Sequence, residues 1–329
     1  MKKILLVVCA ISLISLVGCK KDDPTPEPQP TAGEGIYTPD AHIATVVNND
    51  GTQQWIWNGD KLDRIESSDN EGNATSVQQF TYNGNRIASI SQTISGVQTE
   101  TRISYNGNYI SAISIFTDGV ESVRATVNHS AANKINRVDL NVDASYITNL
   151  LGMLTQGGLS FKGNDGRKLT LNSTNIYATF DWEGDDVRRM IVNADINAGV
   201  TMDDIGQIID LNAILGDMAA LLGLIQGEQP LVINLRDTID FTYDEHHNPL
   251  QGFIGMLDPQ VLSANNYILS ENRGSAHVNL SFNIPLIPAL DTTISILRVS
   301  DLFYTYNNAG FPLTVSDDQG NETTYTYHE

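Results

Sequence analysis

Short stretches of alternating apolar and polar residues, separated by glycine-containing turns, make up most of this chain. Strict alternation puts the apolar side chains of a strand on one face, so each stretch predicts a β-strand with one buried face. In residues 275–284 the apolar residues alternate with Ser, His and Asn. A second apolar row runs from Leu231 to Tyr243 and is interrupted at Asp237, and a third runs from Met190 to Ala198.

Turn signals recur regularly in the first half of the chain. They contain glycines spaced 8 to 13 residues apart, namely Gly51, Gly59, Gly72, Gly84, Gly96, Gly107 and Gly119. Asn-Gly pairs favour type I′ hairpin turns, and this spacing leaves room for strands of roughly 8–10 residues without a helix between them. The predicted fold is therefore mainly β: a large antiparallel up-and-down meander that curls into a barrel-like or half-barrel sheet.

Two segments have helical rather than strand periodicity. Ile147, Leu150, Leu151 and Leu154 lie on one helical face, and a longer stripe extends from Ile208 to Ile225. We expect amphipathic helices inserted near 144–156 and 203–226. Such helices either cover an opening of the sheet and fill its core, or form the lid or floor of an apolar cavity. Asp258-Pro259 predicts the start of a third, shorter helix.

The N-terminus has the pattern of an export signal. Lys2 and Lys3 precede the apolar run Ile4–Val17, which is too short to cross a bilayer as a helix, for which about 20 residues are needed. Four prolines between Pro24 and Pro30 then predict a stiff, extended spacer. The expected organisation is a signal peptide over 1–18, a tether over 19–35 and a single β-rich domain over 36–329.

Charge excludes one class of partner. The chain has 39 acidic and 19 basic residues and a formal net charge of -20. Nucleic-acid binding requires clustered Lys and Arg, so it is not expected. The chain has two cysteines; Cys9 lies in the predicted signal peptide, which leaves Cys19 alone and no disulfide.

Leu16-Val17-Gly18-Cys19 resembles the lipobox of bacterial lipoproteins. The resemblance implies that Cys19 is acylated and becomes the new N-terminus, and that two or more acyl chains then hold the protein on a membrane. Lys20-Lys21-Asp22-Asp23 resembles the acidic signal that sends Bacteroidetes lipoproteins to the cell surface, or simply begins the tether. The expected location is the outer membrane, on its cell-surface side or on its periplasmic side.

Three segments repeat an aromatic residue before a turn and an aliphatic residue after it: Trp55–Leu62, Phe80–Ile87 and Ile103–Ile110. They resemble degenerate tyrosine-aspartate (YD or RHS-type) repeats, which are structural units. Together with the anchor, they make the chain similar to a Bacteroidetes outer-membrane lipoprotein family of unknown function with a porin-like β fold. That resemblance implies a large barrel-like sheet and no assigned activity. One face of residues 97–105 carries Glu100 and Arg102, so this strand lacks the outward apolar band of a membrane barrel.

Candidate chemistry is sparse, because common nucleophile, phosphate-binding, dinucleotide and zinc motifs are missing. We therefore predict no catalytic residue, cofactor or metal. Asp244-Glu245-His246-His247 is either a metal cluster or a polar turn, and the turn is favoured because the segment aligns with Asn307–Leu313 at an offset of 63. Glu183, Asp185 and Asp186 are either paired catalytic carboxylates or hairpin-turn residues. Trp55 and Trp57 either stack on sugar rings or belong to the core.

The sequence thus predicts a non-enzymatic, lipid-anchored envelope protein that binds or scaffolds, with an unidentified ligand. One alternative is a carrier of a lipid or other apolar ligand in a β half-barrel closed by helices. Another is a surface glycan-binding protein. The membrane is the expected partner through Cys19, and a small molecule, lipid or glycan is the expected ligand.

Overall fold

The computed structural model describes residues 32–94, 96–142, 170–201, 227–254, 259–282 and 289–328. Sixteen antiparallel strands form a closed barrel in which each strand pairs with its neighbours in sequence and β1 pairs with β16. The strands are β1 (Ile43–Asn48), β2 (Gly51–Asn58), β3 (Lys61–Ser68), β4 (Ala74–Asn83), β5 (Arg86–Ile94), β6 (Val97–Asn106), β7 (Tyr109–Thr117), β8 (Val120–His129), β9 (Ile135–Val142), β10 (Thr170–Glu183), β11 (Asp186–Val200), β12 (Gln229–His247), β13 (Asn265–Leu280), β14 (Leu290–Tyr306), β15 (Pro312–Asp317) and β16 (Glu322–Tyr327). Two short helices accompany them, the 3-10 helix η2 (Ala32–Glu34) and α4 (Pro259–Leu262).

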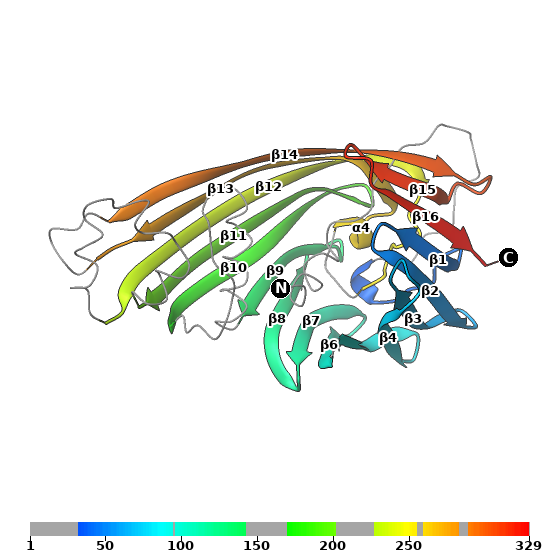
Figure 1. Cartoon of the computed structure of the whole chain (residues 1–329), viewed down its shortest axis with the longest axis horizontal. Helices are drawn as coiled ribbons and strands as arrows, with labels where there is room; N and C mark the ends of the chain where they lie inside the picture. The colour runs from blue at the N-terminus through cyan, green and yellow to red at the C-terminus, as the bar shows by residue number, and fades with distance from the viewer. Residues whose placement is uncertain are drawn as a thin grey trace.

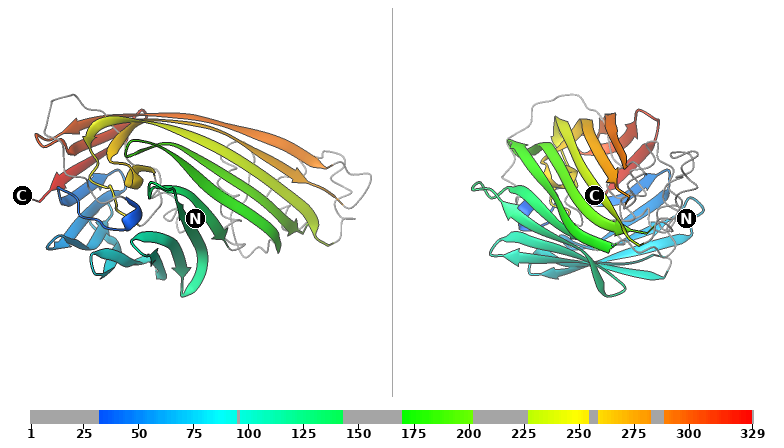
Figure 2. Two further views of the ribbon diagram at one scale, coloured as in Figure 1. Left: turned by 180° about the vertical axis from the view of Figure 1, so that it is seen from behind. Right: turned by 90° about the vertical axis from the view of Figure 1, so that its left-hand side faces the viewer.

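The barrel is longer on one side than on the other, because its strands differ in length. Strands β10 to β14 have 14 to 19 residues, and the other strands have 6 to 10. Among the described residues, β9 pairs with β10 only over Ile176–Thr179, and β15 pairs with β14 only over Leu302–Tyr306. The long strands therefore continue past the short ones as a five-stranded curved sheet (Figures 1 and 2).

The hairpin tips correct one detail of the predicted turns. Asn58 pairs with Lys61, so the two turn residues are Gly59 and Asp60, and of these only Gly59 has a positive φ, of 60°. A glycine at the first turn position is the arrangement of type II′, not of the predicted type I′. The type I′ prediction holds at Asp118-Gly119, where both residues have positive φ.

The repeated sequence segments join each hairpin to an earlier one. Five side chains near the ends of their strands each donate a hydrogen bond to the carbonyl of the aliphatic residue that follows an earlier turn, at 2.6–2.9 Å: Tyr82 to Leu62, Tyr105 to Ile87, His129 to Ile110, Trp182 to Ile135 and Tyr243 to Val187. All five acceptor residues are buried. We call these contacts the inter-hairpin hydrogen bonds; they fix one hairpin end against another.

Cations after the turns reinforce the same contacts. The Lys61 ammonium donates to the Gly84 carbonyl at 2.7 Å and lies over the Tyr82 ring. Arg86 makes the same pair of contacts with Gly107 and Tyr105. The sequence similarity between these segments therefore has a structural cause.

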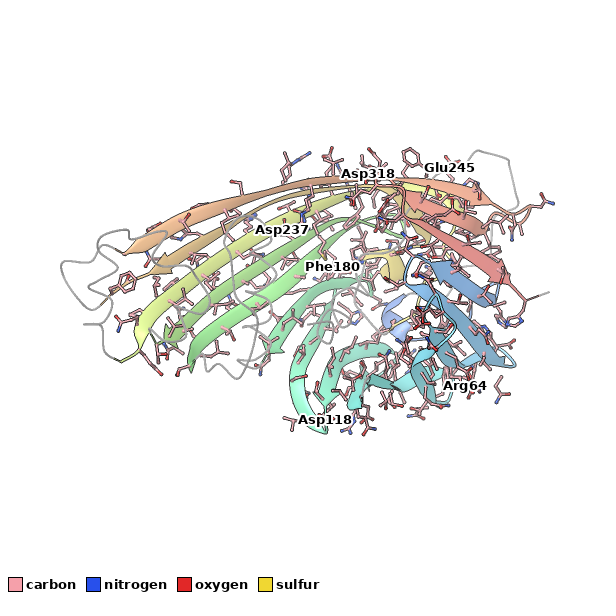
Figure 3. All side chains as sticks on the ribbon, in the orientation of Figure 1. Arg64, Asp118, Phe180, Asp237, Glu245 and Asp318 are labelled. Atoms are coloured by element: carbon pink, nitrogen blue, oxygen red, sulfur yellow. The ribbon has the colours of Figure 1, made fainter. Side chains whose placement is uncertain are left out.

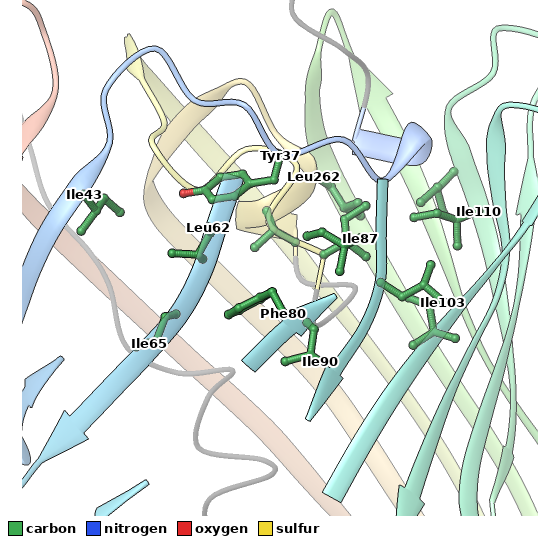
Figure 4. Close-up of a cluster of buried hydrophobic side chains, with 14 of the residues drawn as sticks. Tyr37, Ile43, Leu62, Ile65, Phe80, Ile87, Ile90, Ile103, Ile110 and Leu262 are labelled. Atoms are coloured by element: carbon green, nitrogen blue, oxygen red, sulfur yellow. The ribbon is translucent and has the colours of Figure 1, made fainter. Parts of the chain in front are cut away.

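A packed core fills the barrel at the end where the inter-hairpin hydrogen bonds lie. Residues 248–254 and α4 fold inward, and Phe253 contacts the rings of Tyr37, Trp55 and Phe80 at centroid distances of 5.2, 5.2 and 5.7 Å. Figure 4 shows part of this cluster, with Tyr37 and Leu262 beside the aliphatic residues of β3 to β7. The Tyr37 hydroxyl donates to the Pro249 carbonyl at 2.9 Å and ties the N-terminal segment to the inserted loop.

The structure confirms the mainly β meander, its single connected sheet and the short helix predicted at Pro259, and it establishes that the barrel is closed. The predicted helices near 144–156 and 203–226 lie outside the described residues. So do the predicted signal peptide, residues 1–18, and the part of the predicted tether that contains Cys19.

Candidate functional site

The inner face of the long strands is the best candidate site. Its apolar side chains come from alternate positions of three neighbouring strands, which confirms the three rows predicted from sequence: Met190, Val192, Ala194, Ile196 and Ala198 on β11; Leu231, Ile233, Leu235, Ile239 and Phe241 on β12; Ala276, Val278 and Leu280 on β13. Toward the Gln229 end of β12 this face is buried, with Ile233 and Ala276 at 2% and 1% exposure. Around Leu235 and Ile239 it is only half-buried.

Asp237 lies in the middle of this half-buried region. Its Oδ2 accepts a hydrogen bond from the Asn272 amide at 2.9 Å. The Asp237 Oδ1 and the Asn272 Oδ1 are both buried and have no donor among the described residues. Burial raises the pKa of the Asp237 carboxyl, and the Asn272 amide, the nearby backbone N–H of Thr238 and the charge of Arg298 oppose that shift. Figure 3 labels Asp237 on the long sheet.

Gly274 and Arg298 complete the surroundings of this carboxylate. Gly274 pairs with Asp237 across β12 and β13, and a Cβ at Gly274 would lie 2.4 Å from the Asp237 Oδ1. A glycine inside a strand often marks such a close approach. Arg298 pairs with Asn272 and lies near enough to lower the Asp237 pKa. In the half-buried region between Leu235 and Ile239, Asp237 and Arg298 are the charged inner side chains among the described residues.

The outer face has the opposite character. Ion pairs stand on it in mid-strand, including Arg102 with Glu100 at 2.7 Å, Arg137 with Asp139 at 2.6 Å and Arg189 with Asp240 at 2.6 Å. This confirms the polar outer face predicted for residues 97–105. A barrel embedded in lipid carries an apolar band there, and charges on that band destabilise it. No helix among the described residues is long and apolar enough to span a bilayer.

Comparisons with known proteins give structural similarity only. No protein-family model matches the chain, and no curated protein matches it. Among solved structures, a porin-like protein from Bacteroides uniformis is 8% identical, with a TM-score of 0.39, over 87% of this chain and 98% of the other. A porin-like protein from Bacteroides vulgatus is 10% identical, with a TM-score of 0.30, over 88% of this chain and 99% of the other. Similarity of this degree assigns no function to the chain.

The structure corrects the predicted turn: Asp244–His247 are the last residues of β12, where its pairing with β13 shifts register. The Asp244 Oδ1 accepts hydrogen bonds from the backbone N–H of His246 at 2.9 Å and of Asn266 at 3.3 Å, while the Tyr306 hydroxyl donates to its other oxygen. His246 stacks on the Tyr306 ring. The imidazole of His247 stacks instead on Phe311. No group of three potential metal ligands occurs within the described ranges.

The three acidic residues of the β10–β11 hairpin serve a turn. The side chains of Glu183 and Asp185 are each 77% exposed and pair with Arg188 and Lys134. Asp186 accepts hydrogen bonds from the backbone and side chain of Asn265. These contacts give each carboxylate a structural partner and do not converge on a cleft.

Trp55 and Trp57 are not a sugar-stacking pair on the surface. Trp55 is 4% exposed and packs against Phe253. Trp57 is half-buried, stacks on His42 at 4.1 Å and donates from Nε1 to the Ile43 carbonyl at 2.8 Å. The core interpretation of these residues is therefore confirmed.

Sequence reasoning noticed Asp237 only as an interruption and did not single out Asn272, Gly274 or Arg298. The signal was present in the interruption itself, because a carboxylate in a row of inward apolar residues needs a partner. Its partners come from β13 and β14, and their proximity depends on a strand register that the sequence does not give.

Proposed function

We propose that this protein is a non-enzymatic, lipid-anchored envelope protein that binds an apolar or amphiphilic small molecule on the inner face of β11 to β14. This is the carrier alternative predicted from sequence. The observation that supports it is the half-buried apolar region around Leu235 and Ile239 on a sheet whose outer face is charged. Ligand pockets are lined mainly by apolar side chains with a few placed polar groups, and Asp237 and Asn272 are such groups.

Attachment to the membrane is assigned to Cys19 and not to the strands. Sixteen strands lie within the range of outer-membrane barrels. A water-filled membrane pore has an apolar outer band and a polar interior. This barrel has the reverse: ion pairs lie in mid-strand on its outer face, and the aromatic cluster around Phe253 fills its inside. The outer membrane therefore remains the proposed location, with acyl chains as the anchor.

The glycan-binding alternative is weakened, since it rested on Trp55 and Trp57, which belong to the core. The non-enzymatic assignment is supported by the structural hydrogen bonds of Asp244 in β12 and by the ion pairs of Glu183 and Asp185 in their hairpin.

Mass spectrometry of bound lipid tests the proposal. The protein with Cys19→Ser, purified without detergent, is expected to release an apolar molecule on solvent extraction. Val192→Asp puts a charge on the inner face and is expected to lower its occupancy. Asn193→Asp, one residue along on the outer face, is the matched control and is expected to leave occupancy unchanged. Equal occupancy in both variants, or none in the parent protein, contradicts the proposal.

A further inference from the structure

Two oxygen atoms on the inner face are buried hydrogen-bond acceptors without donors. They are the Asp237 Oδ1 and the Asn272 Oδ1, whose side chains are already joined by the 2.9 Å bond from the Asn272 amide to the Asp237 Oδ2. A buried polar atom without a partner destabilises a folded protein, because it has lost its hydrogen bonds to water. Such atoms are rare in native structures, and each calls for an explanation such as a missing partner.

The surroundings of these oxygens define the partner. Ile239 lies opposite Asn272, and Leu235 lies two residues before Asp237 on the same face, so the polar spot is flanked by apolar wall. The positive Arg298 offsets the negative Asp237. A ligand group that donates hydrogen bonds without a net charge fits this balance better than an ammonium or a carboxylate does.

The absence of a side chain at Gly274 allows the Asp237 carboxylate to occupy its position. Its missing side chain leaves room for the Asp237 Oδ1, which would otherwise lie 2.4 Å from a Cβ. The Arg236 carbonyl would also lie 3.2 Å from that Cβ, so the carboxylate, at the end of a flexible side chain, is the group that would move.

We propose that Asp237 and Asn272 form a recognition site for the hydroxyl head of a neutral amphiphile, whose apolar chain lies along the inner face of β11 to β13. This inference rests on the proposed function and specifies the ligand class for it. The hydroxyl has one hydrogen and donates it to the charged Asp237 Oδ1, while the apolar chain packs against the inner face.

Three probes with the same chain and different heads test the head preference. Calorimetric titration of the full mature-length chain carrying Cys19→Ser is made with dodecanol, dodecanoate and dodecylamine, each below its aggregation concentration. Dodecanol is expected to bind about tenfold or more tightly than either ion, the size expected of a hydrogen bond to a charged group.

Two variants locate the effect. Asp237→Asn replaces the Oδ1 with an amide that can donate to the Asn272 oxygen, so the site loses its unpartnered acceptors, and dodecanol binding is expected to weaken about tenfold. Gly274→Ala keeps the carboxylate but displaces it and is expected to weaken dodecanol binding as well. Asp240→Asn, on the outer face of the same strand, is the control and is expected to change nothing.

Four outcomes are distinguishable. Selective loss of dodecanol binding in Asp237→Asn and Gly274→Ala supports the site. Unchanged dodecanol binding in Asp237→Asn overturns it, because the head then does not depend on the Asp237 carboxylate. Equal binding of all three probes by the parent protein overturns the head preference and leaves the proposed function standing. No binding of any probe overturns both.

Discussion

At the scale of the residue, tyrosine hydroxyls connect one hairpin to another by hydrogen bonds. The hydroxyls of Tyr82 and Tyr105 donate the inter-hairpin hydrogen bonds to Leu62 and Ile87. Tyr82→Phe and Tyr105→Phe each leave a carbonyl short of one donor, so each is expected to lower the free energy of unfolding by about 1 kcal/mol. Urea denaturation measures this. Tyr109→Phe is the control, because no hydrogen bond of the Tyr109 hydroxyl is found in the described structure; a loss as large in this variant would contradict the interpretation.

The same tyrosines predict sensitivity to alkali. Burial raises the pKa of Tyr82 and of Tyr105 from 10.0 to about 12. Above pH 10 the unfolded chain loses these protons while the folded chain keeps them, so the stability is complete below pH 10 and falls as the pH rises toward 12. The urea midpoint is therefore expected to drop over this range. The double variant Tyr82→Phe with Tyr105→Phe is expected to have a shallower drop, and an identical pH dependence would disprove this origin.

At the scale of the element, β14 has an open edge. Its residues 290–301 pair with β13 on one side and have no strand on the other among the described residues. Leu297 on this stretch is 73% exposed, and Val299 is 49% exposed. Exposed apolar edge strands promote association with other chains, and a lysine blocks it. Leu297→Lys is expected to reduce self-association at high concentration, as measured by sedimentation velocity.

Val120→Lys is the matched control for this edge. Val120 is 67% exposed, but it lies in a closed hairpin opposite Thr117. If both variants reduce association equally, then general surface charge, and not the β14 edge, is responsible.

The sequence predicted the strands better than it predicted their ends. Glycine turns separate the short strands, and their spacing fixes the strand lengths from β2 to β8. Strands β10 to β14 are longer than the 8–10 residues expected for the first half of the chain, because the regular glycine spacing that bounds the short strands ends at Gly119. The type II′ tips were missed because pairing begins at Asn58 itself, which moves the turn by one residue.

At the scale of the whole molecule, the barrel has charged residues on its outer face and apolar residues on its inner face. This arrangement predicts that the protein leaves the membrane once its anchor is lost. Cys19→Ser is expected to move the protein from the membrane fraction to the soluble fraction, because the described outer face has ion pairs in mid-strand, where an inserted barrel has an apolar band. Cell fractionation measures this. Retention of the Cys19→Ser protein until detergent is added would mean that the strands themselves insert.

The sequence predicted neither the closure of the barrel nor the Asp237 site, and the reason is the same for both. Both depend on pairings between residues far apart in the chain, such as Tyr325 with Val46 and Asn272 with Arg298. Alternation says which face of a strand is apolar, but register between strands comes from the sum of all hairpins. For this reason, the sequence left open whether the sheet closes.

The pairing of β1 with β16 joins the two ends of the described chain at one seam. Six residues, Glu322–Tyr327, supply the whole of β16. Without them, β1 and β15 would each lack a strand neighbour on one side, so this short strand alone closes the ring. A chain shortened before Glu322 would therefore have two unpaired strand edges, and such edges promote association with other chains.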